Sequence, residues 1–136
     1  MVKIAVRTLA ALCLGLLLLN LLGCADDHKL LSIDVSPQTS TITGAGLNLQ
    51  FTATGHYVHP LENKDITSTV VWASSADQII SFATPSQPGL ATSGSGCGTN
   101  LQISASVYSN PKTPANGSVI SGVATVSVQQ PGGVCQ

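Results

Sequence analysis

Four cysteines carry the most reactive side chains in this sequence of 136 residues. Cys13 lies inside an apolar run, Cys24 follows that run, and Cys97 and Cys135 lie far along the chain. A thiolate is a strong nucleophile that can be alkylated, oxidised to a disulfide or bound to a metal. Which chemistry applies to each cysteine depends on the compartment in which the chain folds.

Residues 1–23 have the pattern of a secretory signal peptide. Lys3 and Arg7 give a positive start, and residues 9–19 carry no polar side chain. A membrane-spanning helix is the alternative, but it needs about 20 continuous apolar residues. Asn20 interrupts the run well before that length. We therefore expect the leader to be removed on export, together with Cys13.

The end of this leader resembles the lipobox of bacterial lipoproteins, with the residues Leu21-Leu22-Gly23-Cys24. In that family the peptidase cleaves before the cysteine, here between Gly23 and Cys24. The thiol carries diacylglycerol as a thioether, and the new N-terminal amine receives a further acyl chain such as palmitate. Two or three chains anchor a protein firmly where one would not. Because Ala25 follows Cys24, the resemblance implies sorting to the outer membrane, on its periplasmic or surface face.

Cleavage before Cys24 leaves a short polar tether, residues 24–29, and one domain, residues 30–136. The exported part has three lysines, six carboxylates and no arginine, so it has no basic surface that could neutralise phosphates. We expect no nucleic-acid partner. Charged residues make up only 8% of the chain, against about a quarter in typical proteins. Serine and threonine replace them, which suits an exported β-protein.

Cys97 and Cys135 remain in the exported domain, where a disulfide is chemically stable. A bridge between them would close the segment from position 97 to position 135 and contribute about 4 kcal/mol by chain-entropy arguments. Two free thiols are the alternative, but export makes idle thiols a liability. Cys97 and Cys135 are therefore the disulfide candidate.

A cluster of metal-ligand types occurs in the segment 56–65, which we expect to be a loop. It contains His56, His59, Glu62 and Asp65. A metal site needs three or four converging ligands that are held in place. Histidines in a loop are more often plain solvated side chains. We expect no metal site and no cofactor.

No catalytic motif is present in the sequence. There is no Gly-x-Ser-x-Gly elbow, phosphate loop or His-Glu-x-x-His helix. Asp26 and Asp27 are paired carboxylates, but a flexible tether does not hold catalytic geometry. We expect that the protein is not an enzyme.

Six segments alternate apolar and polar residues with a period of two, which predicts strands. They are residues 30–37, 46–54, 66–75, 78–84, 101–109 and 123–129. Turn residues separate them, and about seven short strands of this kind indicate an all-β sandwich. The side chains expected to face the core are Leu31, Ile33, Val35, Leu47, Leu49, Phe51, Ala53, Ile66, Val70, Trp72, Ile80, Phe82, Leu101, Ile103, Ala105, Val107, Ala124, Val126 and Val128.

The order of these segments resembles the bacterial immunoglobulin-like domain of group 2. The resemblance covers about residues 30–128 and rests on a Val-Ser-Pro strand end, Phe-Thr-Ala-Thr-Gly, Asp65-Ile66-Thr67, Trp72-Ala-Ser-Ser, Ile-Ser-Ala-Ser and a final Val-Ser-Val. It implies an immunoglobulin-like Greek-key sandwich. Trp72, the single tryptophan, is expected to fill the centre of this sandwich, and the alternative is an exposed tryptophan that binds a ligand.

Two functions remain open. The first is a lipid-anchored module of the cell envelope that mediates surface binding or adhesion, with lipid at one end and loops presented at the other. The contact loops would be 56–65 and 110–117, the second containing Asn110 and Asn116. Beyond the membrane itself, the partner to expect is an envelope protein or a glycan. The second function is a structural or assembly subunit of an envelope complex with no ligand of its own.

Overall fold

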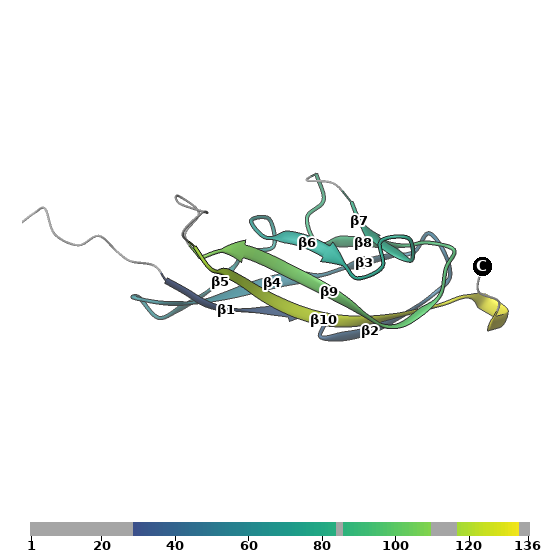
Figure 1. Ribbon diagram of the computed structural model, residues 1–136, viewed down its shortest axis with the longest axis horizontal. Coiled ribbons are helices and arrows are strands. Elements are labelled where there is room, and N and C mark those ends of the chain that lie inside the picture. The colour runs from purple at the N-terminus through teal and green to yellow at the C-terminus, as the bar shows by residue number, and fades with distance from the viewer. Residues whose placement is uncertain (1–28, 84–85, 110–116, 134–136) are drawn as a thin grey trace, which may run out of the picture.

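The computed structural model describes residues 29–83, 86–109 and 117–133, which form an all-β sandwich (Figure 1). The predicted fold class is therefore confirmed. The leader, the tether and the lipobox with Gly23 and Cys24 lie outside the described residues. Asn110, Asn116 and Cys135 also lie outside them, so the predictions for these residues are not tested.

One layer of the sandwich is a four-stranded sheet. Its strand order is β2 (Thr39–Thr43), β10 (Val119–Gln129), β9 (Gly98–Tyr108) and β6 (Val71–Ser74). β2 runs parallel to β10, and the other neighbours are antiparallel. None of these four strands contains a charged residue.

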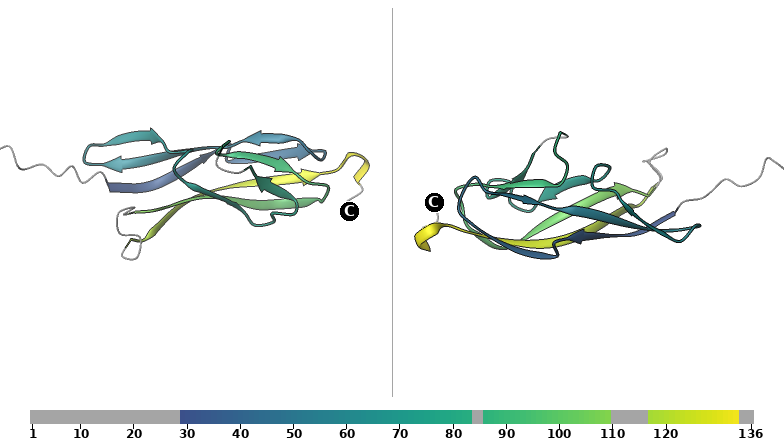
Figure 2. Two further views of the ribbon diagram at one scale, coloured as in Figure 1. Left: turned by 90° about the horizontal axis from the view of Figure 1, so that it is seen from above. Right: turned by 180° about the vertical axis from the view of Figure 1, so that it is seen from behind.

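The other layer consists of two short sheets that continue one another (Figure 2). The first has the order β1 (Lys29–Ser36), β4 (Thr52–Val58) and β5 (Glu62–Asp65), and the second has the order β3 (Asn48–Gln50), β8 (Leu90–Ser93) and β7 (Ile80–Phe82). Only Phe51 separates β3 from β4. The two strands are therefore one path of the chain that pairs with different neighbours before and after Phe51.

The connections follow a Greek-key path between the layers. The chain leaves the four-stranded sheet after β6, forms β7 and β8 in the opposite layer, and returns as β9 beside β6. The described residues contain ten strands, more than the expected seven or so. The sequence pattern missed β2, β5 and β8, and it joined β3 and β4 into one strand.

The core lies between the two layers and follows the predicted alternation closely in β9 and β10. Ile103, Ala105, Ala124, Val126 and Val128 are all buried as expected. Burial of this kind is the dominant stabilising contribution for a domain of this size. The other fully enclosed apolar side chains are Leu30, Ile33, Val35, Ile42, Phe51, Ala53, Ile66, Val70, Ile80 and Ala91.

Two of the predicted core positions are wrong. Leu31 is 54% exposed because the pairing of β1 with β4 shifts register between Leu30 and Ser32. Such a bulge adds one residue and reverses the alternation, so Leu30 takes the buried position instead. Leu47 is 47% exposed because it belongs to the turn before β3, outside any strand.

Three aromatic rings meet where the layers face each other. Phe51 is fully buried, and its ring centroid lies 6.2 Å from that of Trp72 in β6 and 6.1 Å from that of Phe82 in β7. Trp72 and Phe82 stack at 5.4 Å. Aromatic pairs at such distances contribute about 0.5–1.5 kcal/mol beyond the area that they bury. The cluster therefore connects strands of both layers through Phe51.

Replacement of Phe51 should test this arrangement. Phe51→Ala would leave a cavity beside the stacked pair of Trp72 and Phe82, and we expect the free energy of unfolding to fall by about 3–5 kcal/mol. Chemical denaturation followed by tryptophan fluorescence measures this change. Leu47→Ala is the matched control, because an exposed position should change stability by no more than about 0.5 kcal/mol. Equal effects of the two substitutions would contradict the assigned core.

Candidate functional site

The segment 56–65 is a β-hairpin, and the prediction of a loop there is wrong. His56 lies in β4, Glu62 and Asp65 lie in β5, and a tight turn connects the strands. His59 occupies this turn with a φ of 59°, in the left-handed region. Of the predicted contact residues in this segment, only His59 therefore lies in a connection.

His56 has a side-chain partner on each side, in the two neighbouring strands. Its Nε2 lies 2.7 Å from Oδ2 of Asp34 in β1, and its Nδ1 lies 2.7 Å from Oδ1 of Asn63 in β5. Both partner atoms are oxygen acceptors, so both ring nitrogens donate only when the imidazole is protonated. The hydrogen bond with Asp34, and then that with Asn63, raises the pKa of His56 above its ordinary value of 6.5.

This arrangement does not provide a general base. A catalytic histidine uses one nitrogen to accept a proton while the other is held by an orienting group. In His56 both nitrogens are engaged, by Asp34 and by Asn63. His56 and Asp34 instead form a cross-strand ion pair, in which the charge of the imidazole depends on pH.

The metal-ligand types in this hairpin do not converge. His56 pairs with Asn63 across the strands, whereas Glu62 pairs with Tyr57, and neighbouring residues of a strand point to opposite faces. Glu62 and His56 therefore project from opposite sides of the sheet. Within the described ranges, no group of three or more His, Cys, Asp or Glu side chains could hold a metal ion.

Asp65 organises the turn that leads to β6. Its Oδ1 accepts a hydrogen bond from the backbone N–H of Thr67 at 2.8 Å. Hydrogen bonds from the Thr67 side chain and backbone lower the pKa of Asp65. The Thr67 hydroxyl accepts from Ala53 N at 2.9 Å, and the Thr67 carbonyl accepts from Trp72 Nε1 at 3.0 Å. This network gives Asp65 a structural role, and its contact role stays a prediction.

Trp72 packs against the core but is not fully enclosed. With Phe82 it lines two hollows of about 350 and 320 Å³ between the edge strands β6 and β7. Asp77 and Ser81 are the polar residues of the first hollow. One face of the indole is stacked on Phe82 and its N–H is bonded to Thr67, so the ring serves mainly in packing.

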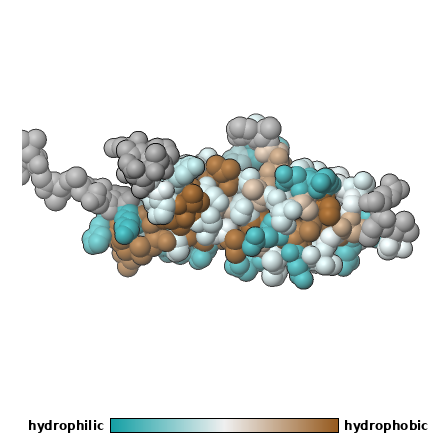
Figure 3. Space-filling model, viewed as in Figure 1, coloured by the Kyte–Doolittle hydropathy of each residue, from teal (hydrophilic) through white to brown (hydrophobic). Residues whose placement is uncertain are grey.

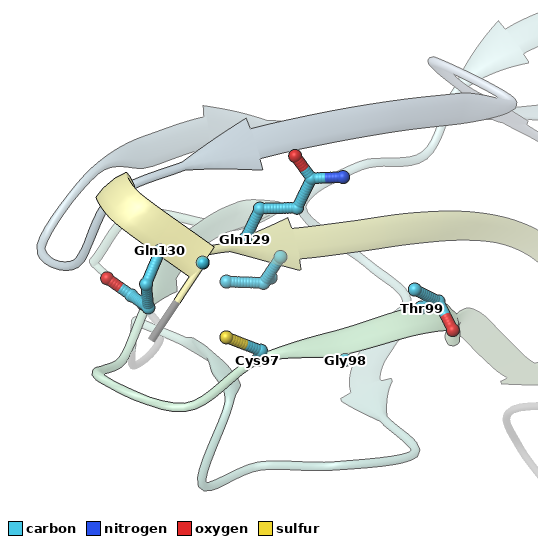
Figure 4. Close-up of a pocket in the computed structure, with 7 residues that line it drawn as sticks. Cys97, Gly98, Thr99, Gln129 and Gln130 are labelled. Carbon is cyan, nitrogen blue, oxygen red and sulfur yellow. The ribbon is translucent and has the colours of Figure 1, made fainter. Parts of the chain in front are cut away.

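A third hollow, of about 430 Å³, lies beside Cys97 at the far end of β9 and β10 (Figure 4). Gln130 borders it and donates from Nε2 to the carbonyl oxygens of Gly94 and Gly96, both at 3.1 Å. Cys97 immediately precedes β9 and is in disulfide form. Its expected partner, Cys135, lies outside the described residues, so the pairing stays a prediction.

The outer face of the four-stranded sheet is broad and uncharged. Across β6, β9 and β10, Val71 aligns with Ser106 and Ser121, and the hydroxyl oxygens of these serines lie 3.0 Å apart. In the next row, Ala73 and Ser104 align with Val123. Val71 is 70% exposed and Val123 is 47% exposed. We call this surface, formed by the outward side chains of β2, β6, β9 and β10, the uncharged face.

Charged side chains of the described residues lie mainly in the other layer. Lys29 and Asp34 belong to β1, and Glu62, Lys64 and Asp65 belong to β5. Within this layer the charges belong to the sheet of β1, β4 and β5, and β3, β7 and β8 carry none. Figure 3 shows that hydrophilic and apolar residues are interspersed on one side of the molecule, with a hydrophilic patch at the end where the chain enters the sandwich.

No protein-family model matches the chain, and no curated protein is similar to it. None of the described segments is a helix long and apolar enough to cross a membrane.

The sequence analysis did not predict the uncharged face, because this surface contains no motif of reactive side chains. The sequence does contain an indication of this face, since residues 90–109 and 117–130 contain no charged side chain. Mapping the charges onto the predicted strands would have shown that they avoid β9 and β10. Asp34 was missed because its contact with His56 joins strands that are distant in the sequence.

The ion pair of His56 predicts a pH dependence of stability. The pKa of His56 is raised in the folded chain. The contribution of its ion pair to the free energy of unfolding is therefore fully present below the unfolded pKa of about 6.5. The contribution is lost as pH rises through the folded pKa. Asp34→Asn removes the carboxylate that is the main cause of the raised pKa of His56. We expect the stability difference between the parent and this variant to be larger at about pH 6 than at about pH 8.

Thermal unfolding of both chains across this pH range measures the difference, and NMR titration of the His56 ring measures the pKa directly. Ser32→Ala, at the residue of β1 that pairs with His56, is the matched control because the assigned His56 hydrogen bonds do not involve Ser32. A ring titration unchanged by Asp34→Asn would contradict the assigned interaction.

Proposed function

We propose that the chain is a lipid-anchored, non-catalytic immunoglobulin-like module of the cell envelope that binds a partner through the uncharged face. The anchor would be Cys24, after cleavage between Gly23 and Cys24. The apolar leader and the lipobox resemblance support this anchor. The likeness of the strand order and motifs to the bacterial immunoglobulin-like domain of group 2 supports a role in binding or adhesion.

The uncharged face is the observation that carries the binding role. Charged residues are depleted at the centres of protein interfaces because their desolvation is costly. Four neighbouring strands without a charged residue, with Val71 and Val123 exposed between serines, fit such a centre. A sheet face of this kind has area and hydroxyl groups but little depth, which suits a macromolecular partner more than a small ligand.

The second candidate is a structural or assembly subunit of an envelope complex. The same face supports it, because permanent interfaces are less charged than transient ones. The two functions differ in when the face is covered. In an assembly subunit it would be covered in every resting cell, and in an adhesion module it would be free until the partner is met.

The anchor is tested by Cys24→Ala. We expect this chain to remain uncleaved or to become soluble, because the side chain that accepts the lipid is missing. Labelled palmitate and membrane flotation measure the outcome. The parent chain should incorporate the label and float with the membrane. Incorporation of the label into Cys24→Ala at the level of the parent would overturn the lipoprotein assignment.

The face is tested by a photo-crosslinking side chain in place of Val123. In the assembly role we expect one discrete crosslinked product in growing cells. In the adhesion role the product should form only after the cells meet their target surface. Ser32, exposed on β1 in the other layer, is the matched control position. If position 32 crosslinks as efficiently as position 123 under both conditions, the uncharged face is not the binding surface.

A further inference from the structure

Three parts of the chain meet at one end of the sandwich. Lys29, the first residue of β1, pairs with Val58, the last residue of β4. The turn between β4 and β5 therefore lies beside the start of β1, and the end of β9 and the start of β10 lie at the same end of the molecule (Figure 1). We call this the tether end, because the segment 24–28 joins the sandwich here.

The most exposed large apolar side chain of the described residues lies at the tether end. Leu61 is 89% exposed and follows Pro60 in the turn between β4 and β5. Pro60 has a fixed φ, and the strands on either side are paired up to Tyr57 and Glu62. The turn therefore holds a leucine at the tip of a short hairpin, in contact with solvent.

The tether end also carries residues of the types that membrane interfaces favour. Tyr57 and Tyr108 are the only two tyrosines of the chain, and both belong to strand ends here, Tyr57 paired with Glu62 and Tyr108 with Val119. Tyrosine is enriched where one end of a side chain is apolar and the other is hydrated. Both apolar and hydrated groups are therefore available on this end.

The charges at the tether end are also suited to a lipid surface. Lys29 pairs opposite Val58, and Lys64 pairs opposite Gly55, and these are the only lysines of the described residues. Glu62 lies beside the turn, and Asp34 and Asp65 lie farther along the sheet, where both pair with Thr54. Lysine stems can cover apolar surface while their ammonium groups contact anionic headgroups. The other end of the sandwich, by contrast, has no lysine within the described ranges.

The length of the tether limits where this end can be. Four residues, Ala25 to His28, separate the proposed lipid-bearing cysteine from Lys29. An extended chain spans at most roughly 3.6 Å per residue, so Lys29 lies within about 18 Å of the acylated residue. The tether end is thereby kept next to the bilayer, at a high local concentration of lipid headgroups.

From these observations we infer that the tether end docks on the lipid surface, with Leu61 inserted at the boundary between headgroups and acyl chains. This inference rests on the proposed lipid anchor. It gives the domain a fixed orientation, in which the hairpin of β4 and β5 contacts lipid. The uncharged face and the turn that contains Leu47 then remain accessible to a partner.

A tryptophan probe tests the docking in the full lipidated chain, reconstituted in vesicles of phosphatidylethanolamine and phosphatidylglycerol. Leu61→Trp reports on the tether end, and Leu47→Trp is the matched control at the opposite end, where Thr43 pairs with Gln129. Both leucines are exposed, so neither substitution should disturb folding. We expect vesicles with doxyl-labelled lipid to quench the emission of Leu61→Trp strongly, and that of Leu47→Trp no more than the parent chain with Trp72.

A second measurement leaves Leu61 in place. Hydrogen exchange at the turn between β4 and β5 should be slower in the vesicle-bound chain than in Cys24→Ala, and Leu61→Asp should remove the difference. Equal quenching at positions 61 and 47 in chains that float with the vesicles would overturn the docking but leave the anchor intact. If the chains do not float at all, the anchor is wrong and the docking fails with it.

Discussion

The fold depends on Phe51, which lies between β3 and β4 and packs against β6 and β7. Its ring is fully buried against both Trp72 and Phe82, and its backbone N–H donates to the carbonyl oxygen of Gly89 at 2.8 Å. Gly89 has a φ of 77°, and a Cβ there would collide with the Phe51 carbonyl oxygen. Only glycine permits this approach without strain. The chain therefore changes its neighbours at Phe51, from β8 beside β3 to β1 and β5 beside β4.

The sequence predicts those parts of the fold in which one strand keeps one pair of neighbours. β9 and β10 lie in the middle of a sheet with one buried face, so their alternation of apolar residues is regular and the prediction is confirmed. The prediction fails for Leu31 because a bulge depends on the partner strand, which the local pattern does not contain. β5 was missed because its sequence, Glu-Asn-Lys-Asp, is polar throughout and it pairs only with β4.

The candidate site shows the same division between local and long-range information. The motif Asp65-Ile66-Thr67 is local, and in the structure it forms a turn that bonds Ala53 and Trp72, so its residues act in folding. The pairing of His56 with Asp34 and Asn63 needs three strands in register. No spacing rule within one segment predicts it. The reactive residue types alone therefore indicated binding loops where the structure has a hairpin and a turn network.

The orientation of the domain follows from the antiparallel pairing of its first strands. The loops after β4 were expected to lie far from the tether, yet antiparallel neighbours run in opposite directions, so β4 ends where β1 begins. The turn with His59 is therefore fixed at the end from which the tether leaves. This follows for any chain whose first strand pairs antiparallel with the strand before the turn. A partner of an anchored domain would then bind to the outer faces of the sheets or to the opposite end. Of the two outer faces, the one formed by β2, β6, β9 and β10 has no charged residue whose desolvation would oppose binding.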